Sequence, residues 1–549
     1  MKNKQKEKDT LKWIYASSKS QLLRLVLVMI INAFVAGTGT LTALVTKELL
    51  DSATVGNING LVKFSVICAL IAVLQIGLSI FLRFYTEKLR AKLDIAFKGK
   101  LFSTQLSKSY AQVRVFHTGE LINRLTGDVS VITDAITNLP PTVVSVTVRL
   151  VCAFTVLVVM QWQFAVVFAI GGVIIFVTTR LLRDKVKQLH KDMQKQEGKV
   201  RSFWQEVLEN LLVIKSFGAE DASVEKSSVL QDDHYKVRMK KTAVGALSSG
   251  ASHFVMRFGY IFALVWCAYK MLLGEMSFGS LTAITALVAQ VQMPFSSLSG
   301  IMPRYYAAIS SAERIMEIEA LTDEKKTDGD VEQLPSYNEF SKISIKNLDF
   351  GYDSSLVIKN FSFDIHKGDF VSVTGESGIG KSTLFKLLLA IYERNGGEID
   401  FEFDKETVSV GKITRQLFAY VPQGNLLFSG TIRENLMFLA GEKSDEEIAF
   451  ALKVACADEF VSKFSDGLET VISEGGMGLS EGQAQRLAVA RAILSGRDIL
   501  LFDEATSALD EKTEKKMLEN IKNLTDKTCI MVTHKPAALE ICNKGLHLS

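Results

Sequence analysis

The sequence predicts a membrane protein in two parts: an all-α part with six spanning helices, followed by a soluble α/β part. Three observations support this fold class. Hydrophobic residues make up 48% of the 549 residues, a large share for a chain that is 22% charged. The long apolar runs all lie before Met302, and a complete phosphate-binding motif, Gly375 to Thr383, lies after them. A chain of this length also exceeds one ordinary domain.

Six apolar segments are long enough to cross a bilayer, which takes about 20 mostly apolar residues. They are Leu22–Val45, Leu61–Phe81, Leu139–Met160, Phe164–Leu182, Leu247–Leu272 and Phe278–Met302. Short turns without Lys or Arg join them in pairs, at Asp51–Gly60, Gln161–Gln163 and Gly274–Ser277. The long connections, Arg83–Arg124 and Arg180–Lys241, are basic. The positive-inside rule therefore predicts that both termini and both long connections are cytoplasmic.

The long connections are predicted to be helical rather than loop-like. Glu87–Leu106 and Asp184–Gln205 keep a helical apolar period and contain no proline, and their only glycines are Gly99 and Gly198. The spanning helices should therefore continue into the cytoplasm as long rods. We expect a short crossing element in each connection, near Tyr110–Phe116 and Leu211–Phe217.

Charge and cysteine content argue against several classes of function, and changes in composition along the chain suggest the domain boundaries. The net charge of +3 gives no sign of a nucleic-acid-binding protein. The six cysteines are scattered without a Cys-x-x-Cys pair, which favours small buried hydrophobic residues over a metal site or disulfides. No signal-peptide cleavage site is evident, so the first span is predicted to stay in place. We predict an arm at 1–20, a transmembrane domain at 21–319, a linker at 320–341 and a nucleotide-binding domain at 342–549.

Charged residues inside the predicted spans are few. Arg149 lies in the third span, and Arg257 lies near His253 in the fifth. A charge in hydrocarbon costs a few kcal/mol and usually faces a cavity or a partner. Arg149, His253 and Arg257 are therefore candidates for a substrate path, which would suit an anionic or amphipathic substrate. The alternative is that Arg257, like Arg304, extends to the inner interface.

The phosphate-binding motif has the sequence context that its chemistry needs. An apolar strand, Phe370–Val373, precedes it and a helix, Leu384–Ile391, follows it. Backbone N–H groups of such a loop and the helix N-terminus hold phosphate oxygens. Lys381 can reach the β- and γ-phosphates, and Ser382 can ligate Mg²⁺. The candidate phosphate-binding residues are Gly375, Ser377, Gly378, Gly380, Lys381, Ser382 and Thr383.

Two further motifs are compatible with ATP hydrolysis. The apolar strand Ile499–Phe502 ends in Asp503 and Glu504. An acid at this position can hold the Mg²⁺ shell, and a second one can orient the attacking water. Leu479–Gln483 precedes a helix, Ala484–Leu494, and would offer a hydroxyl and free N–H groups to an anion. Taken alone, these motifs could be two exposed acids after a buried strand and an ordinary helix N-cap.

The order of the motifs resembles the nucleotide-binding domain of an ATP-binding cassette (ABC) transporter. The resemblance runs from Tyr352 to His534 and includes Gln423, Leu-Ser-x-Gly-Gln at 479–483, Asp503-Glu504 and Ser507–Asp510. In the other part, His117–Asp128 resembles the segment that follows an exporter's first coupling helix. The resemblance therefore covers nearly the whole chain.

The resemblance implies a role for each matching residue. Tyr352 would stack on adenine, Gln423 would contact Mg²⁺, and His534 would position Glu504 and its water. Glu504, His534 and Gln423 are thus the expected catalytic residues, and Ser382, Gln423 and Asp503 the expected Mg²⁺ contacts. The residues expected to complete the ATP site across a dimer are Ser480, Gly482, Gln483 and Asp510, with Glu474 contacting a partner's coupling helix.

The expected protein is therefore an ABC exporter half-transporter that uses ATP and Mg²⁺ and works as a homodimer. It would move a lipid, peptide or amphipathic small molecule out of the cytoplasm or inner leaflet by alternating access. A heterodimeric exporter and an ATP-gated channel or regulator remain alternatives. The expected location is a bacterial inner membrane, with the ATPase domain cytoplasmic. Two departures from the family pattern are Glu481 in place of the usual Gly and the short stretch after His534, where we expect the family's C-terminal helices to be truncated or absent.

Overall fold

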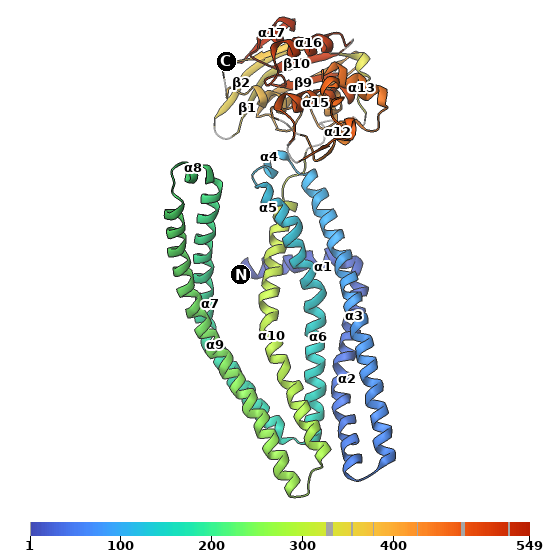
Figure 1. Cartoon of the computed structure of the whole chain (residues 1–549), viewed down its shortest axis with the longest axis vertical. Coiled ribbons are helices and arrows are strands. Elements are labelled where there is room, and N and C mark those ends of the chain that lie inside the picture. Colours follow the sequence, from blue (N-terminus) through green and yellow to red (C-terminus); the bar gives the residue numbers. More distant parts are fainter. Residues whose placement is uncertain are drawn as a thin grey trace. The chain divides into compact units, whose positions relative to one another are not determined.

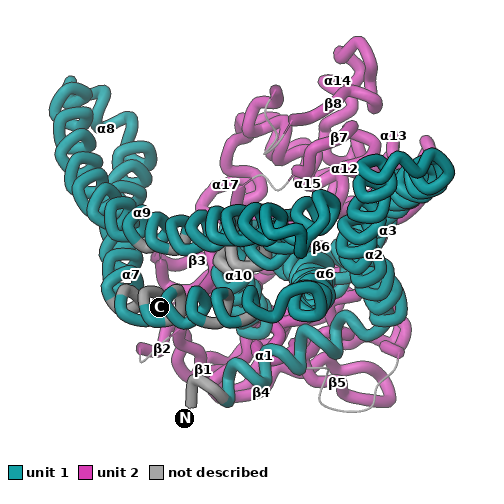
Figure 2. Tube along the Cα trace, turned by 90° about the horizontal axis from the view of Figure 1, so that it is seen from below, with its two compact units in different colours: residues 1–102, 118–317 teal, residues 103–117, 318–549 magenta. Residues whose placement is uncertain are grey.

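The chain forms two compact units in a computed structural model (Figure 2). The structure describes residues 2–324, 333–352, 355–376, 378–424, 427–473, 478–524 and 527–548; side chains at 2–4, 248, 252, 293–299 and several positions in 165–184 are not among those described. The helical unit comprises residues 1–102 and 118–317, and the sheet unit comprises residues 103–117 and 318–549. The segment 103–117 thus groups with the sheet unit, a grouping that the sequence did not indicate.

The helical unit consists of long helices, each of the six longest carrying one predicted span (Figure 1). Its helices are α1 (Lys2–Ser18), α2 (Leu22–Thr54), α3 (Ile58–Ser107), α5 (Thr118–Asn123), α6 (Val129–Met160), α7 (Gln163–Glu209), α8 (Leu211–Ser216), α9 (Glu220–Leu272) and α10 (Phe278–Glu319). The predicted continuation of the spans into long rods is confirmed, since α3 has 50 residues and α7 has 47. The predicted crossing elements are confirmed as α8 and as α4 (Tyr110–Val113), which belongs to the sheet unit.

Length and composition identify four membrane-spanning candidates among the described residues. These are the helical stretches Gln5–Thr54, Ile58–Ser107, Thr118–Met160 and Glu220–Leu272. The predicted spans in α7 and α10 include side chains outside the described residues, so this criterion does not cover them in full.

A shared apolar core joins the helices near the predicted outward turns. Leu157 of α6, Phe164 of α7, Cys267 of α9 and Leu287 of α10 are fully buried in it, together with Ala43 of α2. Away from this core the helices associate in pairs, and α7 and α9 run side by side along much of their length (Figure 1). Buried apolar side chains also occur far from this core, such as Leu93 of α3, Ile132 of α6 and Ile315 of α10.

Helix α10 is fixed at two levels by carboxylates, the half-buried Asp51 and the buried Asp128. Near its start, Asp51 of α2 accepts hydrogen bonds from the Gly279 N–H and from the Ser277 hydroxyl, each 2.9 Å long. A Cβ at Gly279 would lie 2.3 Å from the Lys47 carbonyl oxygen, so only glycine allows this approach. Farther along, Asp128 accepts from Ser311 at 2.9 Å and from the Arg314 guanidinium. These contacts fix α10 against α2 and against the start of α6.

The sheet unit contains two main sheets. A four-stranded antiparallel sheet has the order β2-β1-β4-β5, and a five-stranded parallel sheet has the order β11-β3-β10-β9-β6. The strands are β1 (Phe340–Gly351), β2 (Leu356–His366), β3 (Phe370–Thr374), β4 (Gly396–Phe403), β5 (Thr407–Ser409), β6 (Phe418–Val421), β9 (Ile499–Asp503), β10 (Thr528–Val532) and β11 (Lys544–His547). A separate antiparallel pair consists of β7 (Gly430–Thr431) and β8 (Val471–Ile472). The helices are α11 (Lys381–Leu388), α12 (Ile432–Ala440), α13 (Asp445–Val454), α14 (Asp458–Val461), α15 (Glu481–Leu494), α16 (Glu511–Lys522) and α17 (Pro536–Ile541).

The parallel sheet is buried on both faces, which explains why its strands read as continuous apolar runs. Along β9, Ile499 and Leu501 pack in a core with the antiparallel sheet and α11, and Leu500 and Phe502 pack in a second core with α12, α13 and α15. The predicted strands before the phosphate-binding motif and before Asp503 are confirmed. The double burial fixes the carboxyl ends of the parallel strands as a rigid edge.

Candidate functional site

The candidate nucleotide residues come together at the carboxyl edge of the parallel sheet. The phosphate-binding loop follows β3, Gln423 follows β6, Glu504 follows β9 and His534 follows β10. In the sheet, β3, β10, β9 and β6 are consecutive neighbours with parallel register. Loops after parallel strands meet at one edge, which is where ligands bind in open α/β sheets.

The phosphate-binding loop has the backbone that its glycines allow. Gly375, Gly378 and Gly380 have φ values of +144°, +85° and +112°, a region that side chains rarely occupy. Gly380 is the N-cap of α11, and a Cβ there would lie 2.9 Å from the Val357 side chain. The loop therefore presents the α11 N-terminus openly to an anion. Ser377, also predicted to bind phosphate, lies outside the described residues.

Lys381 and Ser382 begin α11 and face the sheet edge. The Lys381 ammonium donates to the carbonyl oxygens of Gly375 at 2.7 Å and Glu376 at 3.0 Å. The Ser382 hydroxyl donates to Asp503 Oδ1 at 3.1 Å, and the Tyr420 hydroxyl donates to Asp503 Oδ2 at 3.3 Å. Burial raises the pKa of Asp503 above its usual value. A serine hydroxyl beside a carboxylate is a donor set that fits Mg²⁺, which prefers hard oxygen ligands.

Two of the three predicted catalytic residues contact each other. The Gln423 side-chain amide donates to Glu504 Oε2 at 2.8 Å. Glu504 has φ of +53°, in the left-handed region, and its N–H donates to the Val532 carbonyl oxygen of β10. His534 is exposed at the end of β10 and, among the described residues, makes no hydrogen bond to either of them.

Tyr352 contacts the phosphate-binding helix through its hydroxyl. Its hydroxyl and that of Thr383 are 2.8 Å apart, so Tyr352 sits directly beside α11. The ring is half exposed and contacts Phe350 and Tyr392 edge to face. An aromatic face that is supported from below and open above suits stacking by a flat base.

The Leu-Ser-x-Gly-Gln motif forms the start of α15. Ser480 is the N-cap, and its side chain and that of Gln483 form a capping box. A Cβ at Gly482 would lie 2.9 Å from the Ala508 carbonyl oxygen, which explains the glycine. Glu481 is exposed in the first helical turn, where a carboxylate is favourable. No hydrogen bond in the described part of the chain joins these residues to the phosphate-binding loop.

Asp510, like Ser480, is an N-cap. It begins α16 and accepts a hydrogen bond from the Thr513 N–H, which lowers the pKa of Asp510. It is exposed, as a residue that contacts a second chain would be in a single chain. Glu474, expected to contact a coupling helix, lies outside the described residues.

The sequence reading missed residues that position the site from behind. The Gln485 amide bonds both the Ser507 hydroxyl at 2.9 Å and the Ala508 N–H at 3.1 Å, so it ties α15 to the Ser507–Asp510 loop. Lys535 donates to the carbonyl oxygens of Thr506 and Leu509 in the same loop. The available signal for Gln485 was a glutamine within the otherwise apolar, alanine-rich face of α15.

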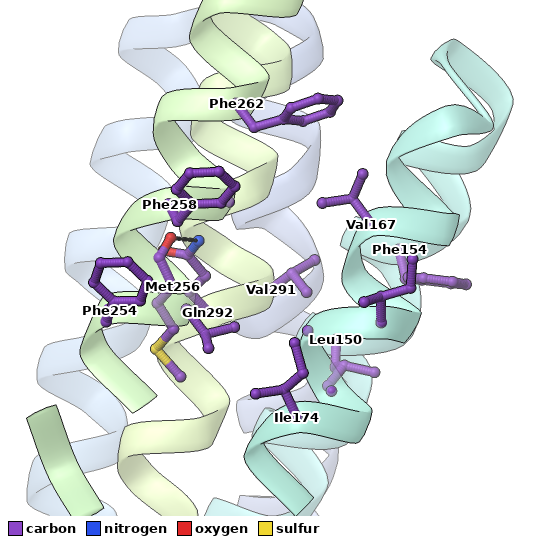
Figure 3. A pocket seen from close by; sticks show the side chains of 15 residues that line it. Leu150, Phe154, Val167, Ile174, Phe254, Met256, Phe258, Phe262, Val291 and Gln292 are labelled. Carbon is purple, nitrogen blue, oxygen red and sulfur yellow. Dashed lines mark hydrogen bonds between the residues drawn. The ribbon is translucent and has the colours of Figure 1, made fainter. Parts of the chain in front are cut away.

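The helical unit contains an apolar cavity of about 600 Å³ (Figure 3). Side chains from α6, α7, α9 and α10 point into it, among them Leu150, Phe154, Val167, Phe258 and Val291. Gln292 also lines it, and its amide donates to the Met256 carbonyl oxygen at 2.6 Å. Among the residues that the structure describes, the lining includes no charged side chain. The cavity is thus chemically suited to hydrocarbon.

A second, polar cavity of about 400 Å³ lies between α2, α3 and α6. Arg83, Glu87 and Arg90 of α3 line it, opposite polar residues of α6 such as Asn138 and Ser145. The two cavities lie on different faces of α6, because Leu150 and Phe154 are about 120° and 160° around the helix from Asn138.

The predicted substrate-path residues do not line the apolar cavity. Arg149 lies on the face of α6 that carries Asn138, Thr142 and Ser145, by helical spacing. His253 and Arg257 are exposed on α9, with the Arg257 guanidinium 6.0 Å from the centre of the Tyr260 ring. The structure thus separates Arg149 from the other two, and their joint role stays a prediction.

Known proteins resemble both parts of the chain. Residues 25–295 match the family described as "ABC transporter transmembrane region", and residues 358–507 match the family described as "ABC transporter". An "ATP-dependent lipid A-core flippase" of Pasteurella multocida (strain Pm70) is 30% identical over 429 residues, covering 77% of this chain and 73% of the relative. The chain belongs to the ABC transporter family. It is a half-transporter, with one membrane region and one nucleotide-binding domain, and the family couples ATP hydrolysis to transport across a membrane.

Other comparisons agree with the transporter's architecture. A "Putative export ATP-binding/permease protein" of Rickettsia felis (strain ATCC VR-1525 / URRWXCal2) is 29% identical over 526 residues, covering 94% of this chain and 90% of the relative. The structure of a bacterial Atm1-family ABC exporter with ATP bound has a TM-score of 0.77 with this chain at 22% identity, covering 96% of this chain and 94% of that one. The fold of this transporter is therefore that of an ABC exporter.

Proposed function

We propose that this ABC exporter moves an amphipathic, lipid-like molecule out of the inner leaflet, using two copies of the chain and ATP with Mg²⁺. The observation that carries the substrate class is the apolar cavity of about 600 Å³, since the described residues of its lining offer hydrocarbon contacts and no charge. The lipid substrate named for the flippase relative supports the same class. Peptides rich in charge would fit such a lining poorly, because their polar groups would lose hydration without gaining partners.

The carboxyl edge of the parallel sheet would bind the nucleotide. Tyr352 would stack on the base, and the N–H groups of the loop from Gly375 would hold the phosphates. Lys381 would exchange its bonds to the Gly375 and Glu376 carbonyl oxygens for phosphate oxygens. Ser382 and Asp503 would hold Mg²⁺, which would supply charge neutralisation at the phosphates.

Glu504 would orient and activate the attacking water. Its Oε2 accepts from the Gln423 amide, and that bond would have to open for Oε2 to accept from water. His534, at the end of the neighbouring strand β10, would help to position the water and the γ-phosphate.

A second copy of the chain would complete the site. Ser480, Gly482 and Gln483 begin a helix that makes no hydrogen bond to the phosphate-binding loop of its own chain, within the described residues. In a dimer they would bind the γ-phosphate held by the partner's Lys381. The exposure of Leu212 (81%) and Phe217 (83%) in and beside α8 gives a further reason for a second chain, because these side chains would then have an apolar partner.

Alternating access would follow from this arrangement. ATP binding would draw the two nucleotide-binding domains together, and hydrolysis would release them, so that ATP biases a two-state equilibrium. The long helices α3, α7, α9 and α10 would carry the motion to the spans. The basic long connections support a cytoplasmic position for the nucleotide-binding domains. The bacterial flippase relative supports a bacterial inner membrane as the location.

The test is lipid translocation by the purified chain in proteoliposomes of phosphatidylethanolamine and phosphatidylglycerol. In molecules whose nucleotide-binding domains face the outside of the liposome, the outer leaflet corresponds to the cytoplasmic one. Fluorescently labelled phospholipid in that leaflet should move to the inner leaflet when MgATP is added outside. Glu504→Gln should bind ATP and fail to translocate, and omission of Mg²⁺ should also stop translocation. Glu511→Gln, an exposed acid on α16, is the matched control and should translocate normally.

Other outcomes would contradict parts of the proposal. ATP-dependent ion leak without lipid movement would indicate a gated channel. An ATPase that appears only after mixing with another half-transporter would indicate a heterodimer. ATPase stimulated by short peptides and not by lipids would exclude the lipid-like substrate.

A further inference from the structure

Tyr392 lies between the proposed base-binding tyrosine and the crossing helix α4. It is only 8% exposed. Its ring centre is 5.4 Å from that of Tyr352 and 5.9 Å from that of Tyr110 on α4, and both contacts are edge to face. The Arg114 guanidinium donates to the Tyr392 hydroxyl oxygen at 2.9 Å. One buried tyrosine therefore touches both the nucleotide side and the crossing element.

The start of α4 is fastened by other means. Ser109 N–H donates to the Thr322 carbonyl oxygen, and Glu324 N–H donates to the Ser107 carbonyl oxygen. Lys108 donates to the carbonyl oxygens of Glu319 and Leu321 and pairs with Asp323 at 2.8 Å. These bonds attach the N-terminal side of α4 to the linker. Tyr110 and Arg114 contact the nucleotide-binding domain itself, and both do so through Tyr392.

The contacts divide α4 into a fixed side and a responsive side. The linker side is held by two backbone hydrogen bonds and by the Lys108 side chain, and none of these contacts involves Tyr352 or Tyr392. The Tyr392 side depends on ring orientation, because an edge-to-face pair and a phenol hydrogen bond each require a defined rotamer. Anything that fixes the Tyr352 ring restricts the Tyr392 ring packed against it.

We propose that Tyr392 is a base sensor: a nucleotide base stacked on Tyr352 strengthens the attachment of α4 to the nucleotide-binding domain through Tyr392 and Arg114. The inference rests on the proposed nucleotide site. It assigns to Tyr392 a positioning role, since Tyr392 acts through Tyr352 and Arg114. Coupling of this kind is reciprocal, so attachment of α4 raises nucleotide affinity by the same factor. One aromatic pair supports a factor of about threefold to tenfold.

The sensor distinguishes base from phosphate. Tyr392 packs on the Tyr352 ring, whereas the phosphate-binding residues Lys381 and Ser382 bond to the loop backbone and to Asp503. Thr383, also predicted to bind phosphate, contacts Tyr352 at its hydroxyl and not at the ring face that would take the base. ADP and ATP carry the same base and should act on α4 equally. Inorganic tripolyphosphate carries no base and should occupy the loop without affecting α4.

Hydrogen exchange of the full-length transporter tests the inference. Amide exchange is followed at α4, whose Gln112, Val113 and Arg114 N–H groups are hydrogen-bonded within the helix, and at α11, which reports nucleotide binding. MgADP and MgATP should each slow exchange at α4 by about threefold to tenfold. Magnesium tripolyphosphate should slow exchange at α11 only.

Two variants and one control separate the sensor from general stability. Tyr392→Phe keeps the ring and removes the Arg114 bond, and Arg114→Gln removes the same bond from the other side. Either should reduce the α4 response to MgADP, and the double variant should lose no more than the larger single loss. Tyr337→Phe, which removes a buried tyrosine hydroxyl bond to Thr528 elsewhere in the domain, should respond like the wild type.

Each other outcome has a defined meaning. An α11 that is not slowed by MgATP would refute the proposed nucleotide site. A slowed α11 with an unchanged α4 would refute the sensor alone. An equal α4 response to tripolyphosphate, a normal response in Tyr392→Phe, or a loss of the response in Tyr337→Phe would also refute it.

Discussion

The nucleotide edge of the sheet unit and the apolar cavity of the helical unit are built on different principles. At the edge, several candidate side chains are held by specific partners, as Ser382 and Tyr420 hold Asp503 and as Gln423 holds Glu504. In the cavity, hydrocarbon side chains from several helices share one space, and the Gln292 bond to Met256 is a polar contact in a largely apolar lining. The edge specifies positions of atoms, whereas the cavity specifies only volume and polarity.

This difference predicts how each region responds to substitution. A hydrogen-bonded position at the edge has one chemical solution, so changing it should abolish a step. An apolar cavity can be lined in many equivalent ways, so single changes should shift activity in small increments. Substitutions at both regions can therefore test the comparison directly.

The largest effect is expected from Glu504→Gln at the edge. The amide keeps the shape and cannot accept a proton from water, so ATP turnover should fall by about 100-fold to 10,000-fold. Steady-state ATPase is the measurement, with retained binding of a fluorescent ATP analogue as the control for folding. Hydrolysis within threefold of the wild type would show that another group activates the water.

A steric change at the same edge should come next. Gly380→Ala places a methyl group 2.9 Å from the Val357 side chain in a backbone with φ of +112°. ATP affinity should fall by at least about tenfold, because the loop must distort. The exposed Gly99 in the C-terminal part of α3 has open space around it, and Gly99→Ala should leave ATP affinity unchanged. Equal affinities in the two variants would remove the geometric argument for the loop.

Asp128→Asn tests whether the helical unit contains a position as specific as those at the edge. Asp128 is buried and binds Ser311 and Arg314 of α10, so the change weakens a charged hydrogen-bond pair by about 1–3 kcal/mol. The melting temperature of the detergent-purified protein should fall. Asp94→Asn, which removes only an ion pair between Asp94 and Lys98 on the surface of α3, should leave it nearly unchanged. An unaltered melting temperature in Asp128→Asn would show that the helical unit tolerates substitution at this buried carboxylate as it is expected to do in the apolar cavity.

A smaller effect is expected from Phe258→Ala in the apolar cavity. The side chain lines the cavity beside Phe254 and Met256, so its loss removes contact area without removing the cavity (Figure 3). The apparent KM for lipid-stimulated ATPase should rise by about threefold to tenfold with kcat little changed. Phe84→Ala, an exposed apolar change on α3 outside the cavity, is the control. Complete loss of transport in Phe258→Ala would show that the cavity, like the nucleotide edge, requires particular side chains.

The smallest effect is expected from Arg149→Gln. Arg149 lies on the polar face of α6 and outside the apolar cavity, so transport of a zwitterionic lipid should change by less than about twofold. Transport of an anionic lipid should decrease more than that of the zwitterionic one. Equal rates for both lipids in this variant and in the wild type would remove Arg149 from the substrate path.

The sequence predicted the nucleotide site residue by residue and did not predict the apolar cavity, because only the nucleotide site requires particular residue types. Gly380, Lys381 and Glu504 could be placed because phosphate chemistry dictates residue types at fixed spacings around a strand end. The apolar cavity could not, since Leu150 and Phe258 look like any other apolar residues in a span. Gln485 and Tyr392 were missed because their roles depend on neighbours far away in sequence.

The spans themselves were predicted from hydropathy, and the helices extended beyond them as expected. The assignment of the segment 103–117 to the sheet unit was not foreseen, because α3 is one continuous helix up to Ser107. The contacts that set this grouping, such as those of Lys108 and Arg114, join positions about 200 residues or more apart in the sequence. Hydropathy and local periodicity carry no information at that range.

The two cavities on opposite faces of α6 also have an evolutionary consequence. Asn138 and Ser145 belong to one face, and Leu150 and Phe154 belong to the other. Mutations that enlarge or reshape the apolar side leave the polar side intact, and the reverse holds as well. A lineage could therefore acquire a new cargo by drift on one face of a single helix while selection preserves the other face unchanged.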